Sequence, residues 1–293
     1  TLFRSREEWS AFHTHYDTQM MPAKDPDREL VFKLHTFSSS LKLRLSSSSS
    51  WEHMAGWNMQ IQKNAIGGYS FLLPEYKRFT TGAFWLTTFR LDNQLSVTGG
   101  IRYDRGRIDI AAFEDPYLVE YLHRQGYEEE VIQAYRWRSY PVDRAYGNYS
   151  CSAGVVWTPA AGHLLKMNVG RSFRLPGVNE LASNGVHHGT FRHEKGDATL
   201  SSEQGWQIDA SYTLAYKKME LVVSSFASWF DNYIYLRPMG EWSVLPHAGQ
   251  IYQYSGARAL FMGGEINFNM DFLRHFNYRL VGEYVYTYNR DEH

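Results

Sequence analysis

The feature that most constrains the fold of this chain is an alternation of apolar and polar residues with a period of two. From Trp51 to Ala65 the odd positions are largely apolar and the even positions largely polar. Successive side chains of a β-strand point to opposite faces, so this segment predicts a strand with one apolar and one polar face. The alternation recurs strongly in 95–104, 206–214 and 260–270, and more weakly in 30–45, 83–91, 146–157, 165–173, 221–235 and 278–288.

The predicted strands are long. The pattern gives about ten of them, many with about ten residues or more, whereas globular strands average about 5–6 residues. A strand that crosses a bilayer needs about 9–11 residues. The sequence therefore predicts an all-β fold, part of an antiparallel transmembrane β-barrel, with a soluble antiparallel barrel as the alternative. A change of parity across Ser38, Ser39 and Ser40 predicts a β-bulge in the segment 30–45.

The predicted connections alternate in length. Short turns are expected near 46–50, 92–93, 159–162, 217–218 and 271–275. Long loops are expected near 67–81, 107–144, 174–204 and 237–257, and residues 5–28 also read as a polar loop. Short turns at one end and long loops at the other are typical of membrane barrels, with the long loops outside the cell. Residues 117–125 are compatible with a local helix inside the second long loop.

Composition agrees with a barrel and excludes other classes. Aromatic residues make up 16% of the 293 residues, including 21 Tyr and 9 Trp, which membrane barrels use at their interfaces. The formal net charge of −1 argues against a nucleic-acid partner. No apolar run reaches the length of about 18 residues that a transmembrane helix needs. The single cysteine, Cys151, excludes an internal disulfide.

Three groups of motifs, in this order along the chain, resemble TonB-dependent outer-membrane receptors. The first is Gly99–Asp104, which reads GGIRYD, and the third is Trp229–Ile234, which reads WFDNYI. The second group has three parts. A segment that ends in phenylalanine, a basic residue, a small residue and proline is followed by an "EL" pair and then by a glycine-led segment that runs through a leucine to a glutamate. In this chain these are Gly170–Pro176, Asn179–Leu181, and Gly196–Leu200 with Glu203. The resemblance covers roughly residues 51–288.

The resemblance implies an architecture of which this chain is one portion. Members of the family combine a 22-stranded barrel with an N-terminal plug domain that contacts the TonB complex. Residues 1–293 are accordingly expected to be part of one β-barrel domain, without the plug and the C-terminal strands. Outer-membrane lipid and the TonB complex, reached through the plug, are the implied partners, and the bacterial outer membrane is the implied location.

The implied function is active uptake of a scarce nutrient, with a metal chelate such as an iron–siderophore as the commonest cargo. Zinc, haem and cobalamin remain open as cargo. A passive channel or adhesin is one alternative, and an omptin-like barrel protease is another. That protease class needs facing carboxylate pairs at strand ends, which the sequence does not place. We expect no enzymatic activity and no resident cofactor.

One predicted outer loop concentrates residues that could contact such a ligand. Imidazole and carboxylate groups suit a borderline transition metal or the polar rim of a chelate. We expect ligand contacts from Arg174, Asn184, His187, His188, Arg192, His193 and Glu194, and metal coordination from His187, His188 and His193. Their spacing matches no closed zinc motif. In the alternative interpretation these residues are solvated or pack on other loops.

Two further groups are predicted from strand parity. Charged residues on or near inward positions are expected to pair across neighbouring strands or to face a plug or an anionic ligand; they are Arg102, Asp104, Lys166, Arg171 and Arg174. Aromatic residues near strand ends are expected to anchor the chain at the membrane interfaces. These are Trp51, Trp57, Trp157, Trp206, Tyr216, Trp229, Tyr284 and Tyr286.

Overall fold

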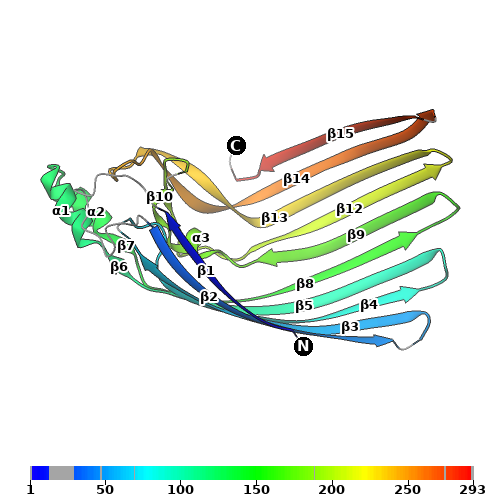
Figure 1. Cartoon of the computed structure of the whole chain (residues 1–293), viewed down its shortest axis with the longest axis horizontal. Helices are drawn as coiled ribbons and strands as arrows, with labels where there is room; N and C mark the ends of the chain where they lie inside the picture. Colours follow the sequence, from blue (N-terminus) through cyan, green and yellow to red (C-terminus); the bar gives the residue numbers. More distant parts are fainter. Residues whose placement is uncertain are drawn as a thin grey trace.

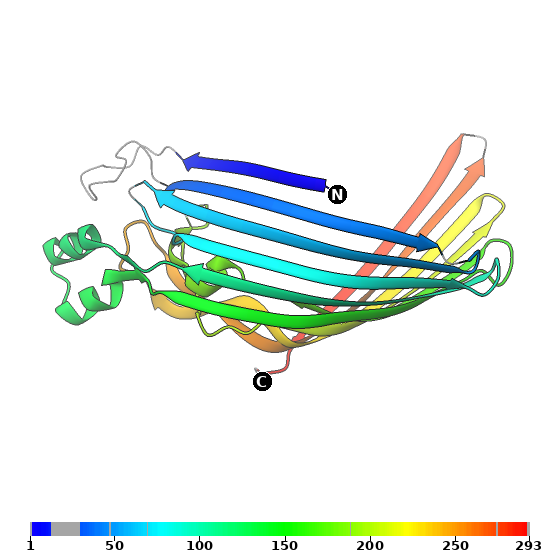
Figure 2. The ribbon, with the colours of Figure 1, turned by 90° about the horizontal axis from the view of Figure 1, so that it is seen from below.

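A computed structural model describes residues 2–12, 30–46, 48–68, 70–187, 189–273 and 275–291. The described chain forms one large curved sheet with open edges, antiparallel except where the short strand β11 pairs with β14 in parallel, and a separate two-stranded sheet (Figures 1 and 2). Strand neighbours follow the order β1-β2-β3-β4-β5-β8-β9-β12-β13-β14, and β15 pairs with β14. This is the wall of a barrel in which neighbouring strands are consecutive along the chain, as hairpin connections require.

The long strands of the wall contain 11 to 24 residues each. Their bounds are β1 Leu2–Phe12, β2 Leu30–Ser46, β3 Trp51–Gly67, β4 Tyr76–Arg90, β5 Leu95–Ile110, β8 Val142–Trp157, β9 His163–Arg174, β12 Glu203–Tyr216, β13 Met219–Trp242, β14 Gln250–Leu273 and β15 Phe276–Asn289. The predicted antiparallel all-β fold is confirmed.

Shorter elements lie in the connections. The β5–β8 connection contains β6 Phe113–Glu114, α1 Pro116–Arg124, α2 Glu129–Arg136 and β7 Trp137–Ser139. The β9–β12 connection contains α3 Val178–Ala182, β10 Asn184–His187 and β11 Arg192–Lys195. The expected local helix corresponds to α1, which starts at Pro116 behind Asp115, whose side chain accepts a hydrogen bond from Leu118 N at 3.0 Å.

The short turns and the long loops lie at opposite ends of the sheet (Figure 1). All five predicted turns join strands at one end, as expected. At the other end the loops are shorter than predicted, because the strands continue past the segments that show clear alternation. The largest difference is at β13 and β14, each of 24 residues, which leave only residues 243–249 as their loop.

The outward face of the wall is apolar. Along β5 the odd positions Val97, Ile101 and Tyr103 are exposed, while Gly106 and Ile108 on the even face are buried. The odd face of β3 presents Trp51, Trp57 and Ile61 in the same way. Exposed aromatic and aliphatic side chains on one face are what a lipid-facing wall requires. No helix among the described residues is long and apolar enough to cross a membrane.

Two local predictions were wrong. Residues 5–12, predicted as part of a polar loop, belong to β1 (Leu2–Phe12), which pairs with β2; the rest of that predicted loop, 13–28, lies outside the described residues. The parity change near Ser38–Ser40 is not a bulge, because β2 pairs with β3 in an unbroken register. The even positions of β2 all lie on its inward face. They are apolar near the loop end, at Phe32 and Leu34, and charged near the turn end, at Lys42 and Arg44. The apolar residues therefore change face along a regular strand.

The inward charges are partly as predicted. Arg102 donates to Asp104 Oδ2 at 2.5 Å and to Asn58 Oδ1 at 2.6 Å, so these charges pair within the wall. Lys166 lines an inner cavity of about 530 Å³ together with Asp209. Arg171 was misplaced, because it shares the outward parity of Met167 and Val169 and lies over the Tyr149 ring at 4.1 Å.

Candidate functional site: the loop cap

The candidate site lies at the end of the wall opposite the short turns. We call it the loop cap and define it as residues 70–75, 111–141, 175–187, 189–202 and 243–249. Helices α1 and α2 project furthest from the wall (Figure 1). Because the strands deliver these loops to one end of the sheet, residues far apart in sequence come together there.

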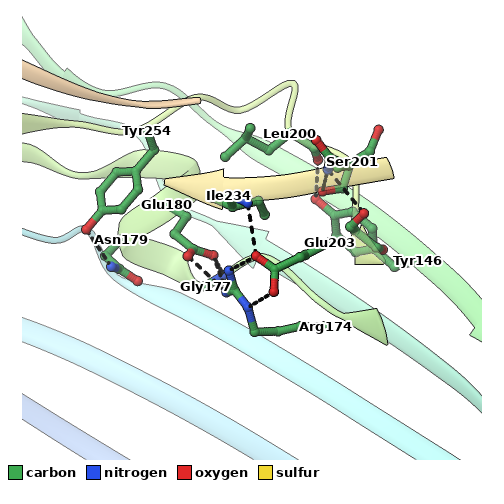
Figure 3. Close-up of polar contacts among 12 residues, drawn as sticks. Tyr146, Arg174, Gly177, Asn179, Glu180, Leu200, Ser201, Glu203, Ile234 and Tyr254 are labelled. Atoms are coloured by element: carbon green, nitrogen blue, oxygen red, sulfur yellow. Dashed lines mark hydrogen bonds and ion pairs between the residues drawn. The ribbon is translucent and has the colours of Figure 1, made fainter. Parts of the chain in front are cut away.

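An ion-pair network fixes the base of the cap to the wall (Figure 3). Arg174, the last residue of β9, donates to Glu180 Oε2 at 2.7 Å and to Glu203 Oε2 at 2.9 Å. Glu180 also accepts from Gly177 N at 2.7 Å, and Glu203 accepts from Ile234 N at 2.9 Å. The side chains of Glu180 and Glu203 are only 11% and 14% exposed. Such charge-assisted bonds are strong and directional.

This network holds α3 against the wall strands. Leu181 and Val178 of α3 are buried in an apolar cluster with Ile108 and Ile110 of β5 and Tyr146 of β8. Ile108 and Ile110 lie on the even face of β5, which is the inward face. The β9–β12 connection therefore folds back onto the inside of the wall.

Two glycines allow the backbones of this connection to pack closely. A Cβ at Gly196 would overlap the backbone of Leu181 and Ala182, and a Cβ at Gly185 would overlap the backbone of Phe71. Gly196 N donates to Ser183 O at 2.7 Å, which fixes the approach. Only a residue without a side chain fits these positions. The glycine-led motif is thus explained by packing of the connection against itself.

His193 of β11 is the centre of the cap. Its side chain is fully buried, and both ring nitrogens are hydrogen-bonded. Nε2 donates to Asn184 Oδ1 at 2.8 Å, and Nδ1 accepts from Ser243 Oγ at 2.8 Å. Asn184 Nδ2 in turn donates to Trp137 O at 3.2 Å. The chain of bonds joins the three loops between β5 and β8, β9 and β12, and β13 and β14.

Burial and two nearby positive charges keep the His193 ring neutral. Burial lowers the pKa of His193 to about 3, and the positive charges of Arg138 and Lys195 act in the same direction. Burial also lowers the pKa of Arg138, to about 10. Arg138 donates to the backbone carbonyl of Asn184 at 2.9 Å and lies over the Phe71 ring at 5.4 Å. The centre of the cap is thus a dense polar network rather than an open site.

An apolar cluster attaches the helices to the rest of the cap. Its members come from α1, α2, β10 and the loop 243–249, and they are Leu118, Leu122, Ile132, Tyr135, Val186 and Leu245. Leu118, Leu122 and Ile132 are completely buried. The amphipathic faces of two short helices are therefore satisfied by partners from other loops, which gives the cap its own core.

The structure places the predicted ligand-contact residues in two groups. Asn184, His193 and Glu194 are interior, and Glu194 accepts a hydrogen bond from Tyr254 Oη at 3.3 Å. His187 is exposed near the tip of the β10–β11 hairpin, where Thr190 Oγ1 lies 3.3 Å from its Nδ1. Arg192 is half-buried there and lies over the Tyr252 ring at 5.2 Å.

Two of the predicted roles need correction. His193 has no free ring nitrogen for a metal, because Asn184 and Ser243 occupy both. Arg174 is bound to two carboxylates and is a structural residue of the wall junction. No group of three or more His, Cys, Asp or Glu in the described ranges is close enough to hold a metal ion. His188 lies outside the described residues.

Sequence reasoning missed several residues of the site. Glu180 and Glu203 were noticed as motif letters, but nothing local showed that both would bind Arg174. Arg138, Tyr135 and Ser243 carried no signal, because their partners are in other loops. A buried charge such as Arg138 looks the same in sequence as a solvated one.

Comparison with known families decides what this architecture is. The family model described as "TonB dependent receptor-like, beta-barrel" matches residues 4–292. The chain belongs to the TonB-dependent receptor family. The arrangement of wall and loops agrees with this membership, as do the ordered motifs, of which the group from Gly170 to Glu203 lies where the wall joins the loop cap. No functionally curated protein has a sequence similar enough to match this chain.

Solved structures share the fold of this TonB-dependent receptor chain at low sequence identity. A double mutant of the Serratia marcescens hemophore receptor HasR, in complex with its hemophore HasA and heme, is 20% identical with a TM-score of 0.63, over 88% of this chain and 42% of HasR. The copper transporter OprC is 14% identical with a TM-score of 0.67, over 89% of this chain and 39% of OprC. The Yersinia pestis ferric yersiniabactin uptake receptor FyuA is 9% identical with a TM-score of 0.52, over 99% of this chain and 39% of FyuA. The chain spans less than half the length of these relatives.

Proposed function

We propose that this chain forms part of the wall and outer loops of an outer-membrane transporter that takes up a metal chelate with energy from the TonB complex. The observation that carries the proposal is the family match over residues 4–292. The structurally similar proteins are described as a heme–hemophore receptor, a copper transporter and a ferric yersiniabactin receptor. Their cargoes are metals or metal chelates, which supports the same class of cargo here.

Under this proposal the tip of the β10–β11 hairpin is the ligand-contacting part of the cap. His187 is exposed there, and Phe191 is 57% exposed at a positive φ of 51°. The carbonyl of Phe191 accepts from Gly249 N at 2.7 Å, so the loop 243–249 fixes the position of the tip. Arg192 adds a positive charge that suits an anionic chelate. The tip thus presents an exposed aromatic ring and an exposed imidazole beside a half-buried guanidinium that lies over the Tyr252 ring.

The remaining partners follow from the same proposal. Outer-membrane lipid contacts the apolar outward face, and a plug within the barrel of the intact protein couples it to TonB. The near-neutral net charge gives no reason to expect a nucleic-acid partner. Residues 1–293 are one portion of a single barrel domain, in a barrel that the family resemblance puts at 22 strands.

A binding experiment tests the ligand-contacting tip. The intact protein in detergent is titrated with a ferric hydroxamate, a ferric catecholate, haem and free zinc. We expect tight binding of one chelate, weakened at least about tenfold by a His187→Ala/Arg192→Ala double variant, since each lost charged contact contributes about 1.4 kcal/mol or more. The matched control is His123→Ala/Arg124→Ala, which removes the same residue types from α1. Equal weakening by both pairs would contradict the assignment of the tip.

An uptake experiment separates active transport from the alternatives. Cells that carry the protein are supplied with the radiolabelled chelate, with and without a working TonB system. We expect uptake only with TonB. Uptake that persists without TonB would support a passive channel instead, and binding without any uptake would support an adhesin or receptor without transport.

A further inference from the structure

The base of the loop cap holds two arginines and two glutamates that are unequally paired. Arg174 lies between Glu180 and Glu203 and binds both of them (Figure 3). Arg78 of β4 forms no hydrogen bond or ion pair with any residue in the described ranges. One arginine thus serves two carboxylates, while the second arginine serves none.

Arg78 lies at the foot of helix α3, on the inward face of the wall. It stands opposite Ile108 in the β4–β5 register, and both residues have the inward parity of their strands. Ile108 packs with Val178 and Leu181 of α3 in one apolar cluster. Arg78 is half-buried in this position. The helix that carries Glu180 is therefore packed against the part of the wall from which Arg78 projects.

Glu180 is the carboxylate whose charge acts on Arg78. Its negative charge attracts the Arg78 guanidinium, and the positive charge of Arg174 repels that guanidinium. Removing an arginine from water without giving it a partner is unfavourable. A transfer of Glu180 from Arg174 to Arg78 would remove this unfavourable charge. Arg174 would keep Glu203, so each arginine would then bind one carboxylate.

The observed arrangement is held by the hydrogen bonds of Glu180. Arg174 Nη1 donates to both carboxylate oxygens, at 2.9 and 2.7 Å, and Gly177 N donates to Oε2 at 2.7 Å. The Oε1 atom accepts from Arg174 alone, and a carboxylate oxygen can accept more than one donor. Neither arrangement therefore satisfies every charge and every hydrogen bond. Elements with two such arrangements are the ones that switch between discrete positions.

The segment that carries Glu180 leads directly into the β10–β11 hairpin. Helix α3 ends at Ala182 and β10 begins at Asn184, so a shift of Glu180 towards β4 also moves the start of the hairpin. Ser183 stands between them. It is 3% exposed, and its Oγ has no hydrogen-bond partner among the described residues. The side chain of Ser183 therefore does not hold the end of α3 in the observed position.

We propose that Arg78 is a positioning residue of the cap, which competes with Arg174 for Glu180. When Glu180 binds Arg174, α3 and the hairpin take the observed position. When Glu180 binds Arg78, both lie nearer to β4. The ligand-contacting tip then has two positions, and the apparent affinity for a ligand falls with the fraction of protein in the wrong one. The inference rests on the proposed function for the role of the tip, whereas the exchange of partners does not depend on it.

Hydrogen exchange of the intact protein in detergent tests the competition by its sign. Arg78→Met removes the competing charge, so exchange of the backbone amides in 178–187 should slow by at least about threefold. An arginine that merely supported the fold would give the opposite sign, because its loss would speed exchange. Arg78→Lys keeps a competing charge and should return the exchange rate towards that of the unaltered protein. The control Lys77→Met removes the neighbouring exposed cation of β4 and should leave 178–187 unchanged.

A distance measurement tests the two positions directly. Nitroxide labels are placed on Thr190→Cys of the hairpin and Arg105→Cys of the wall, both exposed, in a Cys151→Ser background that removes the native thiol. Double electron–electron resonance should give two distance populations in otherwise unaltered protein. The additional substitution Arg78→Met should leave only the population of the observed arrangement.

Several results would overturn the proposal. They are unchanged or faster exchange in Arg78→Met, an equal effect of Lys77→Met, and a single distance population when Arg78 is present. None of these measurements uses a chelate or the TonB system. Failure of chelate binding or of TonB-dependent uptake would therefore leave them unchanged, and the two proposals fail separately.

Discussion

The wall and the loop cap differ in where their stabilising partners lie along the chain. In the wall, β4 and β5 pair along their full length across the turn 91–94. In the cap, His193 bonds Ser243, which is 50 residues away, and Arg138 bonds the carbonyl of Asn184, 46 residues away. The wall is a product of local pairing repeated many times. The cap forms only after the wall has brought four loops to one end, so the two regions should respond differently to substitutions.

The largest effect should come from a charge on the lipid face of the wall. Ile101 is 67% exposed near the middle of the outward band of β5. Ile101→Arg should destabilise the folded protein in a bilayer, lowering its free energy of unfolding by about 2–4 kcal/mol, because the charged side chain lies in hydrocarbon. Urea titration of the protein in vesicles measures this. The control Ser152→Arg lies on the inner polar face and should cost less; an equal cost would contradict the assignment of faces.

Loss of the junction between wall and cap should have the next largest effect. Glu203→Ala removes two bonds to Arg174 and the acceptor of Ile234 N. We expect the cap to lose about 2–3 kcal/mol of stability while the wall stays intact, since a charged network loses one member. Hydrogen exchange in 111–141 and 175–202 reports this loss. The exposed Glu220→Ala of β13 is the control; exchange that rises throughout the wall strands would show that the two regions are not independent.

Acid should loosen the cap before the wall. The pKa of His193 is about 3 in the folded protein, against 6.5 ordinarily, so protons bind more readily when the cap is open. The stability from the neutral ring is fully present above pH 6.5 and is lost as the pH falls from 6.5 towards 3. Limited proteolysis of 111–141 should therefore accelerate over that window. A His193→Gln variant should lack this dependence, and an unchanged pH profile would show that another group controls opening.

The smallest effect should be confined to one helix of the cap. Asp115 accepts from Leu118 N at the start of α1, and Asp115→Ala should cost about 1 kcal/mol. Proteolysis near 115–125 should rise severalfold without a change in exchange at β10 or β11. The exposed Glu120→Ala in the same helix is the control. A loss of protection that spreads to His193 would show that α1 is coupled to the polar network as well as to the apolar cluster.

The sequence predicted the wall much better than the cap. The alternation at Trp51–Ala65 and at Leu95–Asp104 located strands, faces and turns, because period-two patterning acts within one strand. It failed at β1 and at the expected bulge near Ser38–Ser40, where apolar residues are few or change face. In the cap, the sequence located the long loop that carries His187 and Arg192, but not the β10–β11 hairpin within it. It could not show that His193 would be buried while His187 stayed exposed.

What the sequence determined by itself was a long-stranded β-wall with an apolar outer face, because each strand carries its own alternation and each turn lies between its own two strands. Only the tertiary structure decided which polar residues became structural. The sequence predicts ligand contacts for Arg174 and His193, yet other groups of the protein satisfy both: Glu180 and Glu203 bind Arg174, and Asn184 and Ser243 bind His193. Burial is a property of the assembled loops, and no local pattern records it.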